Sequence, residues 1–128
     1  MIDNMERQPK KILIIDDDPT VAESTQLALQ ARGYDALVAN DGAKGLALAE
    51  RERPDLIILD MMIPKRSGFL VLETLRQYDD SFTRVIMLTA IEGDRHREYA
   101  DRLGVDGYLR KPFAIEELLK TIEKALNS

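Results

Sequence analysis

The stretch KILIIDDDPT, residues 11–20, places an apolar run directly before three carboxylates. Ile12 to Ile15 have the composition of a buried strand, whereas Asp16, Asp17 and Asp18 carry three like charges. Two unit charges about 4 Å apart repel by roughly 1 kcal/mol in water and by roughly 4 kcal/mol near a protein surface. A strand that ends in this way indicates that the acids point in different directions or that a cation offsets their charge.

Short apolar runs alternate with amphipathic, helix-like stretches along the whole chain. The expected strands are Ile12–Asp16, Tyr34–Ala39, Leu56–Asp60, Val85–Thr89 and Gly107–Leu109. Runs such as LIILD and VIMLT are apolar on both faces, which is typical of strands buried inside a parallel sheet. The alternation predicts an α/β fold, with a single doubly wound parallel sheet of five strands and five helices packed on its two faces.

Composition narrows the class of protein. A chain of 128 residues without cysteine predicts one domain with no disulfide framework and no thiolate metal site. The net charge of −5 argues against nucleic acid binding by this domain, and the apolar runs are too short to span a membrane. We expect a cytoplasmic domain over residues 10–128, preceded by a flexible polar leader over residues 1–9.

Polar and charged side chains occur where the expected strands end. Asp16 and Asp17 close the first strand, Asp60 closes the third, Thr89 closes the fourth, and Lys111 follows the fifth. In doubly wound sheets, ligands bind beyond the carboxyl ends of the strands. A hard divalent cation such as Mg²⁺ takes carboxylate, water and phosphate oxygens, so the three acids predict a magnesium site.

Asp18 has a different expected role from its two neighbours. It directly precedes Pro19. Asp is a preferred N-cap residue, and Pro is favoured at the first position of a helix. We therefore expect Asp18 to begin the first helix and not to bind metal.

Four segments carry a family resemblance: ILIIDDDP, LIILDMMIPKRSG, VIMLTA and GYLRKPF, in this order and spacing. Together they resemble the receiver domain of two-component response regulators, over roughly residues 10 to 127. The resemblance implies the flavodoxin-like (CheY-like) fold with strand order 2-1-3-4-5. Any one of the segments is weak evidence, but four of them at successive strand ends form a specific signal.

The resemblance implies a phosphorylation site at the same strand ends. Asp60 corresponds to the phosphoacceptor, with Asp16, Asp17 and the backbone carbonyl of Met62 as further ligands of Mg²⁺, for which Mn²⁺ can substitute. A carboxylate is an accepted nucleophile for forming an aspartyl phosphate, and phosphoryl transfer depends mostly on positioning and charge neutralisation.

Three further positions complete the implied signalling machinery. Thr89 corresponds to the residue that donates a hydroxyl to the phosphoryl group, and Lys111 to the cation that pairs with a phosphoryl oxygen. Tyr108 corresponds to the switch aromatic, although an aromatic side chain in a strand is also common as plain packing.

The implied function is a phosphorylation-activated switch in two-component signal transduction. A sensor histidine kinase or a histidine phosphotransfer protein would supply the phosphoryl group. The face made by the fourth helix, fifth strand and fifth helix would respond, and it is the surface through which the family resemblance implies a homodimer. The domain would catalyse its own phosphorylation and a slow autodephosphorylation, because Met62 and Ile91 are apolar and cannot position a water molecule.

Two other functions depend on some of the same residues. A haloacid-dehalogenase-type phosphatase also uses a nucleophilic Asp at a strand end, but it needs a second acid two residues later, where this chain has Met62. A degenerate receiver that acts only as a binding module would lack the acceptor or the lysine, and both Asp60 and Lys111 are present.

Overall fold

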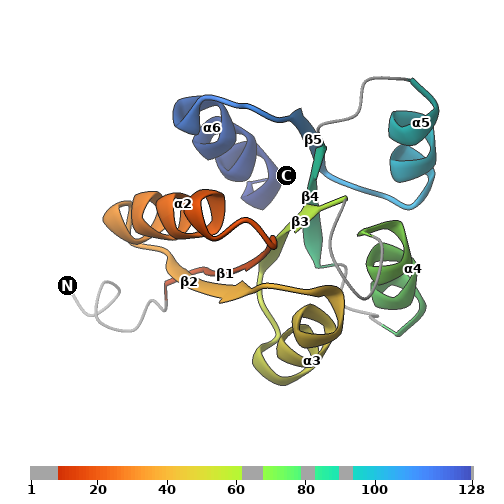
Figure 1. Ribbon diagram of the computed structural model, residues 1–128, viewed down its shortest axis with the longest axis horizontal. Helices are drawn as coiled ribbons and strands as arrows, with labels where there is room; N and C mark the ends of the chain where they lie inside the picture. Colours follow the sequence, from red (N-terminus) through yellow and green to blue (C-terminus); the bar gives the residue numbers. More distant parts are fainter. Residues whose placement is uncertain (1–8, 62–67, 79–82, 90–93, 128) are drawn as a thin grey trace.

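The computed structural model describes residues 9–61, 68–78, 83–89 and 94–127. Its centre is one sheet of five parallel strands in the order β2-β1-β3-β4-β5 (Figure 1). The strands are β1 (Lys11–Ile15), β2 (Asp35–Ala39), β3 (Leu56–Asp60), β4 (Arg84–Thr89) and β5 (Gly107–Arg110). The predicted sheet, its parallel pairing and its strand order are therefore confirmed.

The helices lie in two layers. They are α2 (Pro19–Ala31), α3 (Gly42–Glu52), α4 (Gly68–Tyr78), α5 (Asp94–Arg102) and α6 (Ile115–Leu126). Helices α2 and α6 cover one face of the sheet, and α3, α4 and α5 cover the other (Figure 1). This arrangement is the doubly wound architecture that the alternating pattern predicts.

Strand alternation divides the apolar residues between two cores. Ile12 and Ile14 point toward the layer of α2 and α6, whereas Leu13 and Ile15 point toward α3, α4 and α5. All four are at most 1% exposed. Burying one such side chain contributes about 1.5–3 kcal/mol, so the central strands need apolar residues on both faces.

Five strand boundaries differ by one residue from the sequence-based expectation, and two of these differences have a clear physical cause. Asp16 was expected inside the first strand, but β1 ends at Ile15, and Asp16 turns its side chain to the N–H of Asp18 at 2.9 Å. Tyr34 was expected to open the second strand, but its N–H donates to the carbonyl of Leu29 at 3.1 Å and so closes the end of α2.

Asp18 caps α2 as predicted. Its side-chain oxygen Oδ1 accepts hydrogen bonds from the N–H groups of Thr20 at 3.0 Å and Val21 at 3.3 Å, and Pro19 is the first helical residue. A cap of this kind stabilises a helix by about 1 kcal/mol. The cap fixes the direction in which the chain leaves the acid cluster.

Across the described ranges, no helix is both long enough and apolar enough to cross a bilayer.

Candidate functional site

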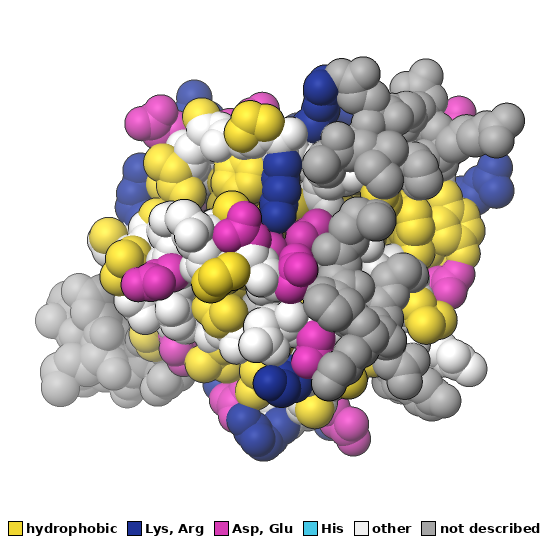
Figure 2. All heavy atoms as spheres, viewed as in Figure 1, with side chains coloured by type: hydrophobic (Ala, Val, Ile, Leu, Met, Phe, Trp, Pro, Cys, Tyr) yellow, Lys and Arg dark blue, Asp and Glu magenta, His cyan; other side chains and the backbone are white. Residues whose placement is uncertain are grey.

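The carboxyl edge of the sheet gathers the candidate residues. Asp60 and Thr89 end the neighbouring strands β3 and β4, Asp16 follows β1, and Lys111 follows β5. Because all strands are parallel, these ends meet at one edge, as the sequence predicts. Acidic and basic side chains meet near the middle of the face seen in Figure 2.

The acid cluster consists of Asp16, Asp17 and Asp60. Each offers a carboxylate oxygen, and these oxygens all lie within 4.8 Å of one another. Asp16 and Asp60 are buried, at 1% and 5% exposure, whereas Asp17 is exposed. Carboxylate oxygens at the solvent edge of a sheet are the donors that Mg²⁺ prefers, so this donor set fits the ion.

Lys111 neutralises part of this charge. Its Nζ lies 2.8 Å from Oδ2 of Asp16 and 3.2 Å from Oδ2 of Asp60. Burial by itself would lower the pKa of Lys111, but the hydrogen bond and charge of Asp16, followed by those of Asp60, outweigh it and raise the pKa above its usual range. The side chain is therefore a fixed cation that touches two of the three acids.

The two neighbouring acids of the cluster have different surroundings. Oδ1 of Asp16 accepts the Asp18 N–H at 2.9 Å, and its Oδ2 accepts Lys111 at 2.8 Å, so both oxygens are hydrogen-bonded within the protein. The exposed Asp17 carboxylate makes no such bond to any residue that the structure describes. Asp16 consequently orients the lysine, while Asp17 keeps its oxygens open to a cation.

Thr89 is fully buried at the end of β4, next to β5. Its carbonyl accepts the N–H of Lys111 at 2.7 Å, and its Cα is paired with Arg110. This backbone link ties the position of the lysine to the strand that carries the threonine. The peptide bond between Lys111 and Pro112 is cis.

Tyr108 lies one strand away from Thr89 and on the same face of the sheet. It is paired with Met87, and residues two apart in a strand share a face. The ring packs against the core under α3, α4 and α5, and its hydroxyl oxygen is buried without a hydrogen-bond partner in the described part of the chain. The guanidinium carbon of Arg97 lies 5.9 Å from the ring centroid.

Gly68 shapes the chain beside the candidate acceptor. Its N–H donates to the carbonyl of Met61 at 2.8 Å. A Cβ at this position would lie 2.6 Å from the backbone oxygen of Asp60 and 2.6 Å from Cα of Met61. Such distances are far below van der Waals contact, so the approach requires glycine here.

Two predicted contributors cannot be placed. Met62, with the carbonyl expected to bind metal, and Ile91 lie outside the residues that the structure describes. Conversely, the structure places Arg97 beside Tyr108, a contact that the sequence does not predict. Its only sequence signal is a basic residue on a very polar helix, which does not distinguish it from other surface arginines.

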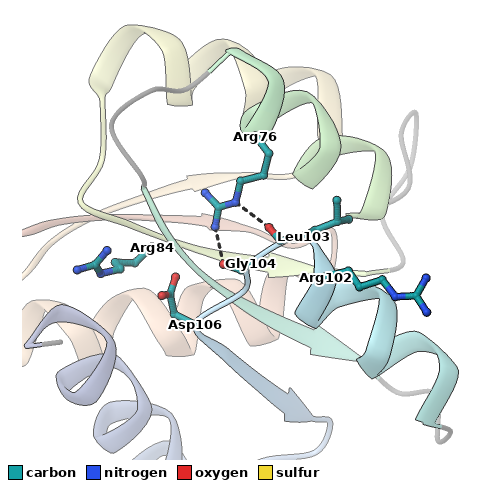
Figure 3. A pocket seen from close by; sticks show the side chains of 6 residues that line it. All are labelled: Arg76, Arg84, Arg102, Leu103, Gly104 and Asp106. Carbon is teal, nitrogen blue, oxygen red and sulfur yellow. Dashed lines mark hydrogen bonds between the residues drawn. The ribbon is translucent and has the colours of Figure 1, made fainter.

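A separate hollow of about 410 Å³ lies at the opposite, amino-terminal edge of β4 and β5. Arg76 lines it and donates to the carbonyls of Leu103 at 2.9 Å and Gly104 at 2.9 Å, as Figure 3 shows. It also donates to the carbonyl of Thr83 at 2.8 Å. These bonds join the end of α4 to the turn before β5 and to the residue before β4, so the contacts of Arg76 are structural. The hollow lies at the other edge of the sheet from the acid cluster.

The family model of the response regulator receiver domain matches residues 12–123. Among curated proteins, the DNA-binding dual master transcriptional regulator RpaA of Synechocystis sp. is 43% identical over 117 residues, which are 91% of this chain and 48% of that protein. The chain spans about half the length of the curated relatives it matches first.

Solved structures of receiver domains are also similar to this chain. A response regulator receiver domain protein (CheY-like) from Methanospirillum hungatei has a TM-score of 0.88 at 30% identity, covering 94% of this chain and 95% of that one. The chemotaxis response regulator CheY4 of Vibrio cholerae has a TM-score of 0.87 at 33% identity, covering 93% and 100%. With the strand order and the acid cluster, these matches show that the chain belongs to the receiver domain family of two-component response regulators.

Proposed function

We propose that this signalling domain accepts a phosphoryl group on Asp60 in a reaction that depends on Mg²⁺. The observation that carries the proposal is the meeting of three carboxylates and one ammonium group at the carboxyl edge: Asp16, Asp17 and Asp60 within 4.8 Å, and Lys111 on two of them. Response regulators work with sensor kinases. We propose a histidine kinase or a histidine phosphotransfer protein as the donor.

The proposed step is a displacement at phosphorus. A carboxylate oxygen of Asp60 attacks the phosphorus atom of a phosphohistidine, the new P–O bond forms as the P–N bond breaks, and the imidazole nitrogen leaves with the bonding electron pair. Asp16, Asp17 and Asp60 would hold Mg²⁺, or Mn²⁺ in its place, through carboxylate oxygens, and the family resemblance adds the Met62 carbonyl. The ion would neutralise charge on the phosphoryl oxygens.

Lys111 and Thr89 orient the transferred group. Lys111 already touches Asp60 at 3.2 Å, so its ammonium group is within reach of a phosphoryl oxygen attached there. It can shift to that oxygen from Asp16 without leaving the edge of the sheet. The Thr89 hydroxyl, on the adjacent strand end, donates to a second phosphoryl oxygen.

A phosphatase that turns over external substrates is the less favoured alternative. In haloacid-dehalogenase-type enzymes a second acid stands two residues after the nucleophile, and position 62 of this chain is methionine. We propose that the domain catalyses only its own phosphorylation and a slow loss of the phosphoryl group.

The response would appear on the face made by α5, β5 and α6, which we propose as a homodimer surface. RpaA is a DNA-binding transcriptional regulator, and this chain covers about half of it. We propose that residues 10–128 form a cytoplasmic receiver unit, preceded by a leader over residues 1–9, that controls an output without itself contacting nucleic acid.

The test is an intact-mass measurement after incubation with acetyl phosphate. In Mg²⁺ the chain should gain one phosphoryl group, and chelation of the metal should prevent the gain. Asp60→Asn should gain none, whereas the matched variant Asp35→Asn, at an exposed acid on the edge strand β2, should gain one. Full labelling of Asp60→Asn would contradict the assignment of the acceptor.

A further inference from the structure

Between Arg97 and Arg102, helix α5 contacts the rest of the domain mainly through partly exposed side chains. Of its side chains from Arg97 to Arg102, Ala100 is buried and the others are exposed. On the side of α4, the Tyr99 ring meets Phe69 edge-on, with centroids 5.0 Å apart and planes at 77°, and its hydroxyl donates to Glu73. A helical segment in which one of six side chains is buried has few contacts that oppose a shift of its position.

The contact on the side of β5 is made by Arg97. Its guanidinium carbon lies 5.9 Å from the centroid of the Tyr108 ring, within the distance at which a cation is attracted to an aromatic face. Residues two apart on a helix are about 200° apart around its axis. Arg97 and Tyr99 therefore hold α5 from opposite sides, one against β5 and the other against α4.

Two opposing contributions act on the inward orientation of Tyr108. Its hydroxyl oxygen is buried and has no hydrogen-bond partner among the residues that the structure describes. Burying a hydroxyl without a partner is unfavourable, whereas burying the ring is favourable. An added attraction to the ring face can thus change which orientation prevails.

We infer that Arg97 is a positioning residue that keeps the Tyr108 ring turned inward and links that orientation to the place of α5. The inference rests on the proposed function, in which a phosphoryl group on Asp60 acts on the face made by α5, β5 and α6, and on Tyr108 of β5 as the switch aromatic that the family resemblance implies. Thr89 shares a sheet face with Tyr108, and Arg97 extends this route from the sheet to the helix. Among the residues that the structure describes, the contact of Arg97 is with Tyr108 and not with the acid cluster, so its role is one of positioning.

The experiment uses the full chain labelled with 3-fluorotyrosine. Fluorine NMR gives one resonance for each of the four tyrosines, and the Tyr108→Phe variant identifies that of Tyr108. Broadening by a soluble paramagnetic reagent reports how far the ring is exposed. Arg97→Ala should reduce the inward population of Tyr108 about 2- to 5-fold and increase the broadening.

Two variants separate the ring contact from a general loss of charge or helix structure. Arg97→Lys keeps a cation and should retain most of the inward population. Arg102→Ala removes an exposed arginine from the same helix and should leave the Tyr108 resonance unchanged. A Tyr108 resonance in Arg97→Ala that matches the wild type would overturn the inference.

Mass labelling of the same samples keeps the two proposals apart. If Asp60 gains a phosphoryl group in both wild type and Arg97→Ala while the Tyr108 spectra are identical, the inference about Arg97 fails and the proposed function stands. If wild type gains no phosphoryl group under Mg²⁺ and acetyl phosphate, the proposed function fails, whatever the Tyr108 spectra show.

Discussion

Lys111 is hydrogen-bonded more closely to Asp16, at 2.8 Å, than to the candidate acceptor Asp60, at 3.2 Å. The lysine is thus shared between an orienting acid and a reacting one. Asp16 also accepts the N–H of Asp18, so its carboxylate is fixed on both oxygens. This arrangement holds the ammonium group beside Asp60 before any phosphoryl group arrives.

Lys111→Ala should destabilise the protein in the absence of divalent cations. The change leaves the buried carboxylate of Asp16 without its cation, at a cost of about 2–3 kcal/mol. Urea denaturation at low salt, with and without Mg²⁺, measures the loss, and the ion should recover part of it. Lys120→Ala, at an exposed lysine on α6, should change the free energy of unfolding by less than about 0.5 kcal/mol. Equal stability of the two variants would show that the Lys111 pair contributes nothing.

Asp17→Asn should raise the stability of the protein without metal and reduce the stabilisation that Mg²⁺ provides. Removing one of three clustered charges relieves repulsion, so the apo variant should be more stable than wild type by about 0.5–1 kcal/mol. Wild type at 100 times the dissociation constant of Mg²⁺ should gain about 2.7 kcal/mol, and the variant should gain much less. Thermal unfolding across a Mg²⁺ titration tests both effects, with Asp35→Asn as the control. Identical Mg²⁺ shifts in wild type and Asp17→Asn would remove Asp17 from the metal site.

Gly68→Ala should damage both stability and phosphorylation. Its Cβ would sit 2.6 Å from the backbone oxygen of Asp60, so the end of β3 must move, at a cost of about 1–3 kcal/mol. Gly45→Ala is the comparison, since the three atoms nearest its Cβ, the closest at 2.5 Å, all belong to the buried side chain of Ile15. That change also crowds the core, but it does not press on the backbone of Asp60. Labelling rates should therefore fall further for Gly68→Ala. A smaller loss of labelling rate there than for Gly45→Ala would contradict this prediction.

Thr89→Ala should still accept a phosphoryl group at Asp60 but transmit its effect poorly. The substitution removes the hydroxyl expected to follow the phosphoryl group, while Lys111 and the acid cluster remain. Amide exchange over residues 93–126, with and without beryllofluoride, measures the response. Thr89→Ser keeps the hydroxyl and should respond as wild type does. Equal protection changes in the alanine variant and wild type would show that Thr89 does not couple the site to that face.

The sequence predicts the fold well because each central strand is apolar on both faces. Its errors occur at strand ends and amount to one residue in either direction. The expected strands leave out Lys11 and Arg110, which pair with Asp35 and Thr89, because a charged residue gives no apolar signal. They include Asp16 and Tyr34, which lie outside β1 and β2. Backbone pairing with a neighbouring strand sets these ends, and a single strand's pattern does not contain that information.

The sequence predicts which residues form the site, but it does not predict which of them are hydrogen-bonded to one another. Strand ends and the family resemblance bring Asp16, Asp60 and Lys111 together, yet the closer bond of the lysine to Asp16 joins residues far apart in the chain. The contact of Arg97 with Tyr108 likewise depends on where α5 packs against β5. Both are tertiary contacts made by a charged side chain, for which hydrophobic periodicity gives no signal.

The most direct test of the central claim locates the phosphoryl group on the chain. Protein labelled by acetyl phosphate in Mg²⁺ is treated with borohydride, which reduces an aspartyl phosphate to homoserine, and tandem mass spectrometry then finds the modified position. We expect homoserine at position 60 alone. Homoserine at another aspartate, with position 60 unchanged, would contradict it.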